Sequence, residues 1–160
     1  MTALRSAPLS RAQQAWPLRD DAQAIGQART ITREELIGVR LRPDLVDDAV
    51  LMVSELVTNA FLYGEAPYEL VIQTGPDEIV FFVVDGGLIL PEQRPADPHA
   101  ENGRGLRIIA ELSGGLYGCQ PQRYATDPEL TGKATWFALP RQSSHAVRHA
   151  EAGETRPIEW

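Results

Sequence analysis

Apolar residues recur at helical spacing along two segments in the first half of the chain. Residues 20–37 place apolar or small side chains three or four positions apart, which predicts a helix starting near Asp20 or Asp21. A stronger pattern begins at Pro43 and stops at Gly64, with a period of about 3.6 residues. We expect this second helix to face the core with the positions Leu45, Val46, Ala49, Val50, Met52, Val53, Leu56, Val57 and Ala60.

The pattern then changes to that of β-strands. Residues 68–74 and 78–84 are rich in β-branched and aromatic side chains, and Gly75–Asp77 between them has the composition of a turn, so we expect a hairpin. Helices followed by a hairpin favour an α+β fold, a two-layer sandwich with a mixed, mostly antiparallel sheet and helices on one face. The later elements predicted are a helix at 106–112 and strands at 116–119 and 133–139.

Length and composition favour one domain with unpatterned ends. The chain has 160 residues, 43% of them hydrophobic, which is enough for a core. We expect residues 1–13 to be a flexible lead-in, 14–140 the folded domain and 141–160 a flexible tail. Residues 88–102 have no periodicity, and a loop of that length in a small domain is typical of a lid or binding loop.

Charge and cysteine content narrow the function classes. The net charge of −7 argues against a nucleic-acid-binding surface, because phosphate backbones need a basic face. The single cysteine, Cys119, fits a reducing compartment, and no apolar run is long enough to cross a bilayer. We therefore expect a cytoplasmic protein.

Four polar signals stand out, each weak when taken alone. Glu55 and Asn59 lie four residues apart on the second predicted helix and so share a face, where an Asn oxygen is a suitable Mg²⁺ ligand. Such pairs are more often simply solvated. Asp85 ends a strand and could accept a base amino group, although Asp-Gly turns are common. Gly103 and Gly105 precede a predicted helix, and the free N–H groups at a helix start favour a bound anion. Thr135 lies in a late predicted strand.

The order of these signals carries more information than any one of them. Glu-x-x-x-Asn-Ala, a strand with Asp-x-Gly, a long loop, Gly-x-Gly-Leu and a late strand Thr together resemble the motif set of the GHKL (Bergerat-fold) ATPases. Ser54–Ala60 and Gly132–Trp136 are especially similar to the anti-sigma-factor-like serine/threonine kinases. The resemblance covers about residues 14–140.

The resemblance implies a role for each matching residue. Asn59 would hold Mg²⁺ against the phosphates of ATP, and Glu55 would act as the general base or position the attacking hydroxyl. Asp85 would accept the adenine amino group, supported by Thr135, and residues 88–102 would be the lid. Gly87 would allow close approach to the base. The phosphates would be surrounded by Gly103, Arg104, Gly105 and Leu106.

Two functions stay open on this basis. The first is an ATP-dependent serine/threonine kinase acting on an anti-anti-sigma-like partner, with a sigma factor as a second partner and dimerisation implied by the same resemblance. The second is a degenerate ATP-binding module that sequesters such a partner, which Ile89 favours because the family's pattern has glycine at that position. A sensor histidine kinase fragment is disfavoured, since no histidine precedes Asn59.

Overall fold

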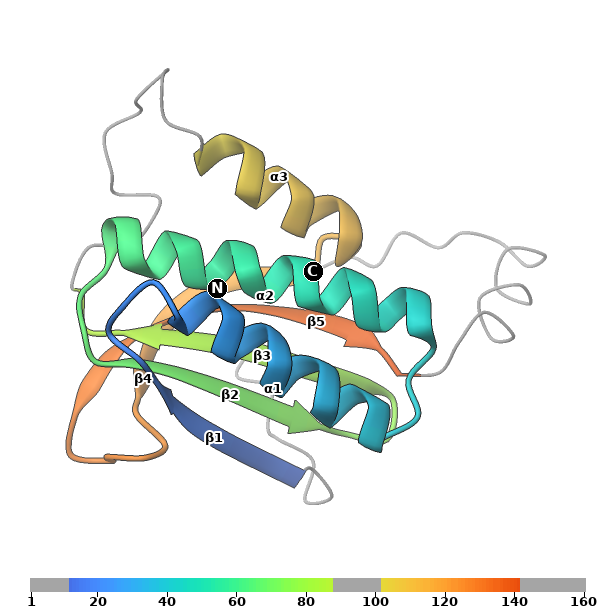
Figure 1. Ribbon diagram of the computed structural model, residues 1–160, viewed down its shortest axis with the longest axis horizontal. Coiled ribbons are helices and arrows are strands. Elements are labelled where there is room, and N and C mark those ends of the chain that lie inside the picture. Colours follow the sequence, from blue (N-terminus) through green and yellow to red (C-terminus); the bar gives the residue numbers. More distant parts are fainter. Residues whose placement is uncertain (1–11, 88–101, 142–160) are drawn as a thin grey trace.

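The computed structural model describes residues 12–87 and 102–141, which form one sheet with helices on one face (Figure 1). The strand order is β1-β2-β3-β5-β4, and every neighbouring pair is antiparallel. The predicted α+β two-layer fold is confirmed, with the described strands antiparallel throughout. The elements are β1 Ala12–Leu18, α1 Ala24–Gly38, α2 Pro43–Tyr63, β2 Tyr68–Thr74, β3 Glu78–Asp85, α3 Asn102–Leu112, β4 Tyr117–Arg123 and β5 Thr131–Pro140.

The sequence pattern did not predict the first strand. β1 pairs with β2 from Ala12 opposite Thr74 to Leu18 opposite Tyr68, so the sheet begins inside the segment that was expected to be a flexible lead-in. Most β1 side chains are exposed or half-buried, and only Leu18 is buried. An edge strand of this kind is held by backbone hydrogen bonds on one side, which leave no alternating apolar pattern in the sequence.

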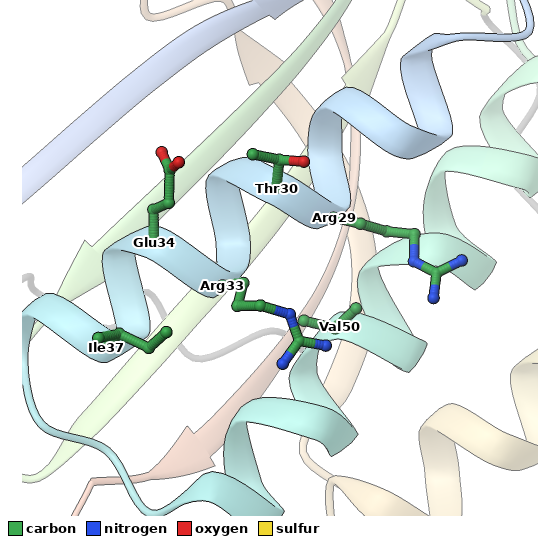
Figure 2. Close-up of a pocket in the computed structure, with 6 residues that line it drawn as sticks. All are labelled: Arg29, Thr30, Arg33, Glu34, Ile37 and Val50. Carbon is green, nitrogen blue, oxygen red and sulfur yellow. The ribbon is translucent and has the colours of Figure 1, made fainter.

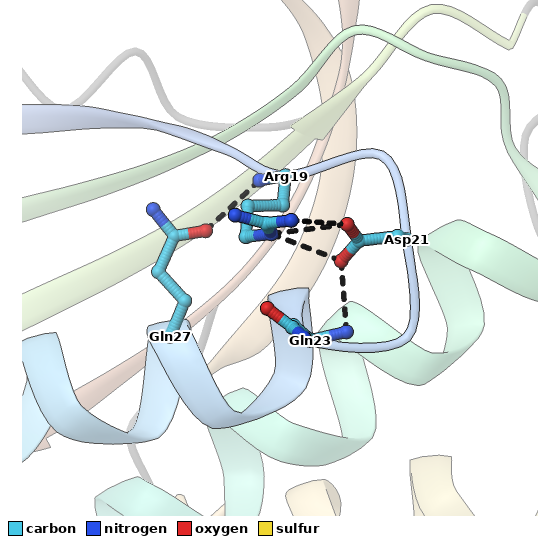
Figure 3. A network of polar contacts seen from close by, with 4 residues as sticks. All are labelled: Arg19, Asp21, Gln23 and Gln27. Atoms are coloured by element: carbon cyan, nitrogen blue, oxygen red, sulfur yellow. Dashed lines mark hydrogen bonds and ion pairs between the residues drawn. The ribbon is translucent and has the colours of Figure 1, made fainter.

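The first helix starts at Ala24 rather than at Asp20, because residues 19–23 form a turn (Figure 3). The Asp21 carboxylate accepts the Gln23 N–H at 2.9 Å and pairs with the Arg19 guanidinium at 2.7 Å. The hydrogen bond from Arg19 holds the pKa of Asp21 below its ordinary value. The Gln27 side chain closes the turn by accepting the Arg19 N–H at 2.9 Å and donating to Pro17 O at 3.2 Å.

Helix α2 is the centre of the core, as its apolar stripe predicts. It lies between α1 and α3 and packs on β3 and β5. Beneath it the rings of Phe81 and Phe137 stack with centroids 4.6 Å apart. Complete burial of a side chain such as Met52 or Leu56 stabilises the fold by about 2 kcal/mol. The predicted stripe is buried at Val46, Ala49, Val50, Met52, Val53, Leu56, Val57 and Ala60, with Leu45 partly buried.

The loop between β4 and β5 is anchored on the other face of the sheet by a buried carboxylate. Glu69 is 1% exposed, and its two oxygens accept the N–H groups of Ala125 and Thr126 at 2.8 and 2.9 Å as well as the Thr126 hydroxyl. The Tyr124 hydroxyl donates to Pro67 O at 2.7 Å. These bonds fix the first residues of the loop that leads from β4 into β5, the strand that carries two residues of the site described below.

Candidate functional site

Strand alternation brings three polar side chains onto the helix-covered face of the sheet. Asp85 lies on the same face of β3 as the core residue Phe81, and Lys133 and Thr135 lie on the same face of β5 as Phe137. The register places Asp85 directly opposite Lys133 and Val83 opposite Thr135. The polar group therefore lies at one end of an otherwise apolar surface.

Asp85 is a buried carboxylate with a restricted environment. Its side chain is 3% exposed, and its Oδ1 accepts the Gly87 N–H at 2.8 Å and lies 3.4 Å from Lys133 Nζ. Burial raises the pKa of the Asp85 carboxyl above its ordinary value, while the Gly87 N–H and the Lys133 ammonium oppose that shift. An acceptor-only carboxylate in this setting can recognise a donor on a flat ligand.

Two glycines allow the chain to come close to Asp85. A Cβ built on Gly87 would lie 2.9 Å from Asp85 Oδ1 and 2.9 Å from Lys133 Nζ. A Cβ on Gly64, at the end of α2, would overlap the Asp85 carboxyl group. The Gly86 N–H donates to Glu65 O at 2.6 Å, which ties the end of β3 to the segment after α2. Gly87 was predicted as a close-approach position, and Gly64 was predicted only as a helix stop.

A second polar group lies between α2 and α3. A Cβ on Gly105 would lie 2.7 Å from Glu55 Oε2 and 3.8 Å from Asn59 Nδ2, so the first turns of α3 lie against both side chains. Glu55 and Asn59 are half-buried. Free N–H groups at a helix start attract anions, so this is a setting in which phosphate oxygens can be held beside a carboxylate and an amide.

Helix α2 connects the two polar groups. Asn59 precedes Gly64 by five residues, a distance of about 8 Å along a helix axis. Gly64 contacts Asp85, and Asn59 lies near Gly105. Asn59 beside Gly105 and Gly64 beside Asp85 are therefore neighbours at the C-terminal end of α2, so this end of the helix links the two polar groups.

The remaining predicted residues are placed to different extents. Thr135 is half-buried, with its hydroxyl 3.9 Å from Cys119 Sγ. Leu106 is half-buried in α3, and Gly103 and Arg104 belong to the first turn of that helix. The predicted lid falls largely on residues 88–101, including Ile89, and these lie outside the described residues.

Lys133 is a site residue that the sequence interpretation missed. It is the only lysine in the chain, and its side chain is 4% exposed. The available signal was a charged residue two positions before Thr135 in an otherwise apolar strand, since buried lysines nearly always have a partner. The identity of that partner depends on the pairing of β3 with β5, which the sequence does not specify.

A shallow depression elsewhere on the surface is a separate feature (Figure 2). It lies over α1 and α2 and contains none of the predicted site residues, so we do not assign nucleotide binding to it. Arg33 at its edge pairs with Asp47 at 3.2 Å, and Ile37 is 62% exposed. Its lining residues are Arg29, Thr30, Arg33, Glu34, Ile37 and Val50.

The described residues contain no group of three or more His, Cys, Asp and Glu side chains that could hold a metal by themselves. Mg²⁺ commonly takes one or two protein oxygens and completes its shell with water and substrate phosphates. Glu55 places its Oε2 beside Gly105, and Asn59, whose side-chain amide also carries an oxygen, has its Nδ2 near the same glycine. Within the same described part of the chain, no helix has the length and apolar character needed to cross a membrane.

Comparison with known proteins identifies the family of the chain. No curated protein matches the chain. The family model of the histidine kinase-like ATPase domain matches residues 18–118, which is more than half of the chain. The match includes Glu55, Asn59, Asp85 and Gly105, while Lys133 lies beyond it. The chain therefore belongs to the histidine kinase-like ATPase family, a family of ATP-binding domains that includes anti-sigma-factor kinases.

Proposed function

We propose that this protein is an ATP-dependent serine/threonine kinase that phosphorylates an anti-anti-sigma-like partner and binds a sigma factor as its second partner. The observation that supports this most is the contact of Gly105 with Glu55 and Asn59, which places a carboxylate and an amide at the start of α3. Phosphoryl transfer needs mainly positioning and charge neutralisation. This arrangement would supply the positioning, and the start of α3 and a bound Mg²⁺ would supply the neutralising charge.

Each residue would have a distinct task. The N–H groups at the start of α3 would hold the phosphates, and the Asn59 side-chain oxygen would hold Mg²⁺, which neutralises phosphate charge when bound. Glu55 would accept the proton of the Ser or Thr hydroxyl as that oxygen bonds to the γ-phosphorus and the bond to ADP breaks. Asp85 would accept the adenine amino group, with Thr135 supporting that contact.

A second candidate function is sequestration of the partner without phosphorylation. It is favoured by Asp85, whose carboxylate is already engaged by the Gly87 N–H and lies beside Lys133. An adenine base that binds Asp85 must replace those contacts with its own. If this replacement is unfavourable, the protein would hold its partner without using ATP. In either function, pairing of two copies of the chain is part of the proposal.

The two candidates differ in what Glu55 does. The protein is incubated with γ-labelled ATP and Mg²⁺, and anti-anti-sigma-like proteins from the same organism are added one at a time in separate reactions. We expect label on a Ser or Thr of one of them, and a loss of about 100-fold in the transfer rate with Glu55→Gln, because general-base catalysis contributes roughly that much. Binding of ATP to this variant should change little.

A matched control is Glu34→Gln, which alters an exposed carboxylate on α1. It should transfer phosphate at the wild-type rate. Tight partner binding without transfer would support sequestration, and transfer that is unchanged in Glu55→Gln would contradict the role of Glu55.

A further inference from the structure

The outer surface of the α1–α2 helix pair combines cationic and exposed apolar side chains. Figure 2 shows Arg29 and Arg33, one turn apart on α1, extending towards α2 over the depression that contains Val50. Ile37, one turn further along α1, is 62% exposed, and Leu51 on α2 is 43% exposed. Arginine is enriched at protein interfaces, where it accompanies apolar side chains. We call this the α1–α2 surface, and it comprises Arg29, Arg33, Ile37 and Leu51.

The positive charge on this surface is only weakly neutralised. Arg29 forms no hydrogen bond or ion pair with another described residue. Arg33 pairs with Asp47 at 3.2 Å, but that carboxylate is 70% exposed, and ion pairs of this kind contribute little to stability. In Figure 2 the Glu34 side chain points away from α2. On a chain with a net charge of −7, the two arginines therefore form a local positive surface that complements a carboxylate of another protein.

The same surface leads along α2 towards the proposed base. Helices α1 and α2 run in opposite directions (Figure 1), and Arg33 of α1 lies beside Asp47 of α2. One turn earlier on α1, Arg29 is therefore level with the turn of α2 that follows Asp47 and carries Leu51. Glu55 follows Asp47 by eight residues, which is about 12 Å along the helix axis. A protein held at Arg29 needs to cover only that length of α2 to present a hydroxyl to Glu55.

We propose that the α1–α2 surface docks the protein that accepts the phosphoryl group, with an acidic side chain of the acceptor at Arg29 and an apolar one at Ile37. The inference rests on the proposed function, because it assigns the surface to the acceptor. Continuity with Glu55 along α2 favours the acceptor over the second partner, which has no need to reach that residue. A shallow depression suits side chains of another protein, whereas small molecules usually bind in enclosed pockets.

Steady-state phosphorylation kinetics separate docking from chemistry. The acceptor is the anti-anti-sigma-like protein that becomes labelled in the transfer assay. Arg29→Glu places a negative charge where a carboxylate docks, so KM for the acceptor should rise at least about 10-fold. The kcat at saturating acceptor and the affinity for ATP should not change, because Arg29 contacts neither ATP nor the reacting atoms in this proposal. Ile37→Asp should raise KM in the same way.

Matched controls change exposed residues far from this surface. Arg123→Glu alters β4, which lies at the opposite edge of the sheet from β1, the strand that α1 contacts. Leu130→Asp alters an exposed apolar residue in the loop before β5. Both controls should keep the wild-type KM, and circular dichroism checks that all four variants are folded. Added salt should raise KM of the wild type and should have much less effect on Arg29→Glu, because salt screens the charge pair that this variant lacks.

An unchanged KM in Arg29→Glu would overturn the inference, as would an equal rise in Arg123→Glu or weaker binding of the sigma factor alone. These results leave the proposed kinase function intact.

Fluorescence anisotropy of each labelled anti-anti-sigma-like protein, without ATP, measures docking when no phosphate is transferred. If one of them binds but is not phosphorylated, the kinase function fails, while at least about 10-fold weaker binding by Arg29→Glu supports docking at this surface and unchanged binding overturns it. Absence of binding by every such protein overturns the inference and the proposed function together.

Discussion

Gly105 of α3 lies directly against the carboxylate of Glu55 on α2, so that a Cβ at position 105 would come 2.7 Å from Glu55 Oε2. The atom in its way is the end of a flexible side chain, whereas a Cβ on Gly64 would meet the buried Asp85 carboxyl and Ala60 O. Substitution at these two glycines should therefore have different consequences, with the first altering the position of Glu55 and the second altering the packing of the core.

Gly105→Ala should impair phosphoryl transfer without destabilising the fold. Alanine in place of glycine within a helix stabilises it by up to about 1 kcal/mol, and Glu55 can swing away from the new methyl group. That movement displaces the proposed base, so we expect at least about a 10-fold loss in transfer rate. Thermal melting and partner phosphorylation are measured together. Gly26→Ala on α1 is the control, because a Cβ there has no neighbour within 4 Å; normal transfer by Gly105→Ala would refute the assignment of Glu55.

Asp85 and Lys133 should be strongly coupled in stability. Lys133→Met leaves a buried carboxylate without its cation and should lower the free energy of unfolding by about 3 kcal/mol at neutral pH. The double variant Asp85→Asn/Lys133→Met removes both charges and should recover at least about 1 kcal/mol of this loss. Urea unfolding of the wild type, both single variants and the double variant measures the coupling, and additive losses would show that the two groups do not interact.

The same pair sets a pH dependence in Lys133→Met. Burial already raises the pKa of Asp85, and loss of the opposing ammonium raises it further. Between the unfolded pKa and this raised pKa the folded state binds more protons than the unfolded state, so stability falls as pH rises. The destabilisation of Lys133→Met relative to the wild type should therefore shrink as pH is lowered from about 8 to about 5. A deficit that stays constant across this range would contradict the placement of Asp85.

Tyr124 should make the fold sensitive to alkali. Its hydroxyl donates to Pro67 O, and burial raises its pKa to about 12. The unfolded value is about 10, so the stabilisation is complete below pH 10 and is lost as pH rises towards 12, with a size of about 2 kcal/mol. Urea midpoints across this range should fall less steeply for Tyr124→Phe. Identical slopes for the two proteins would argue against the buried hydroxyl.

The regular core elements could be predicted from sequence because their apolar periodicity is complete. The stripe from Val46 to Ala60 specifies α2, and the β-branched run before Asp85 specifies β3. β1 could not be predicted in this way, because an edge strand with exposed glutamines has no buried alternation. The start of α1 was misplaced because Asp21 stabilises the preceding turn rather than forming part of the helix.

The candidate site shows a similar division. Glu55 and Asn59 are neighbours by helical spacing, so the sequence alone places them together. The resemblance to a family implied only that Asn59 and Gly105 both serve the phosphates, and the contact of Gly105 with the two side chains depends on how α3 packs on α2. The pairing of Lys133 with Asp85 needs the β3–β5 register, in which Asp85 lies opposite Lys133 across 48 residues of sequence. Contacts between distant elements are set by tertiary packing, which local patterns do not encode.

ATP binding at the two polar groups along α2 is the central claim, and calorimetry of ATP with and without Mg²⁺ tests it most directly. We expect binding by the wild type that is tighter with Mg²⁺, at least about 10-fold weaker binding by Asp85→Asn, and loss of the Mg²⁺ effect in Asn59→Ala. Absence of binding heat in a folded sample at high protein concentration, or affinity unchanged in Asp85→Asn, would contradict the account.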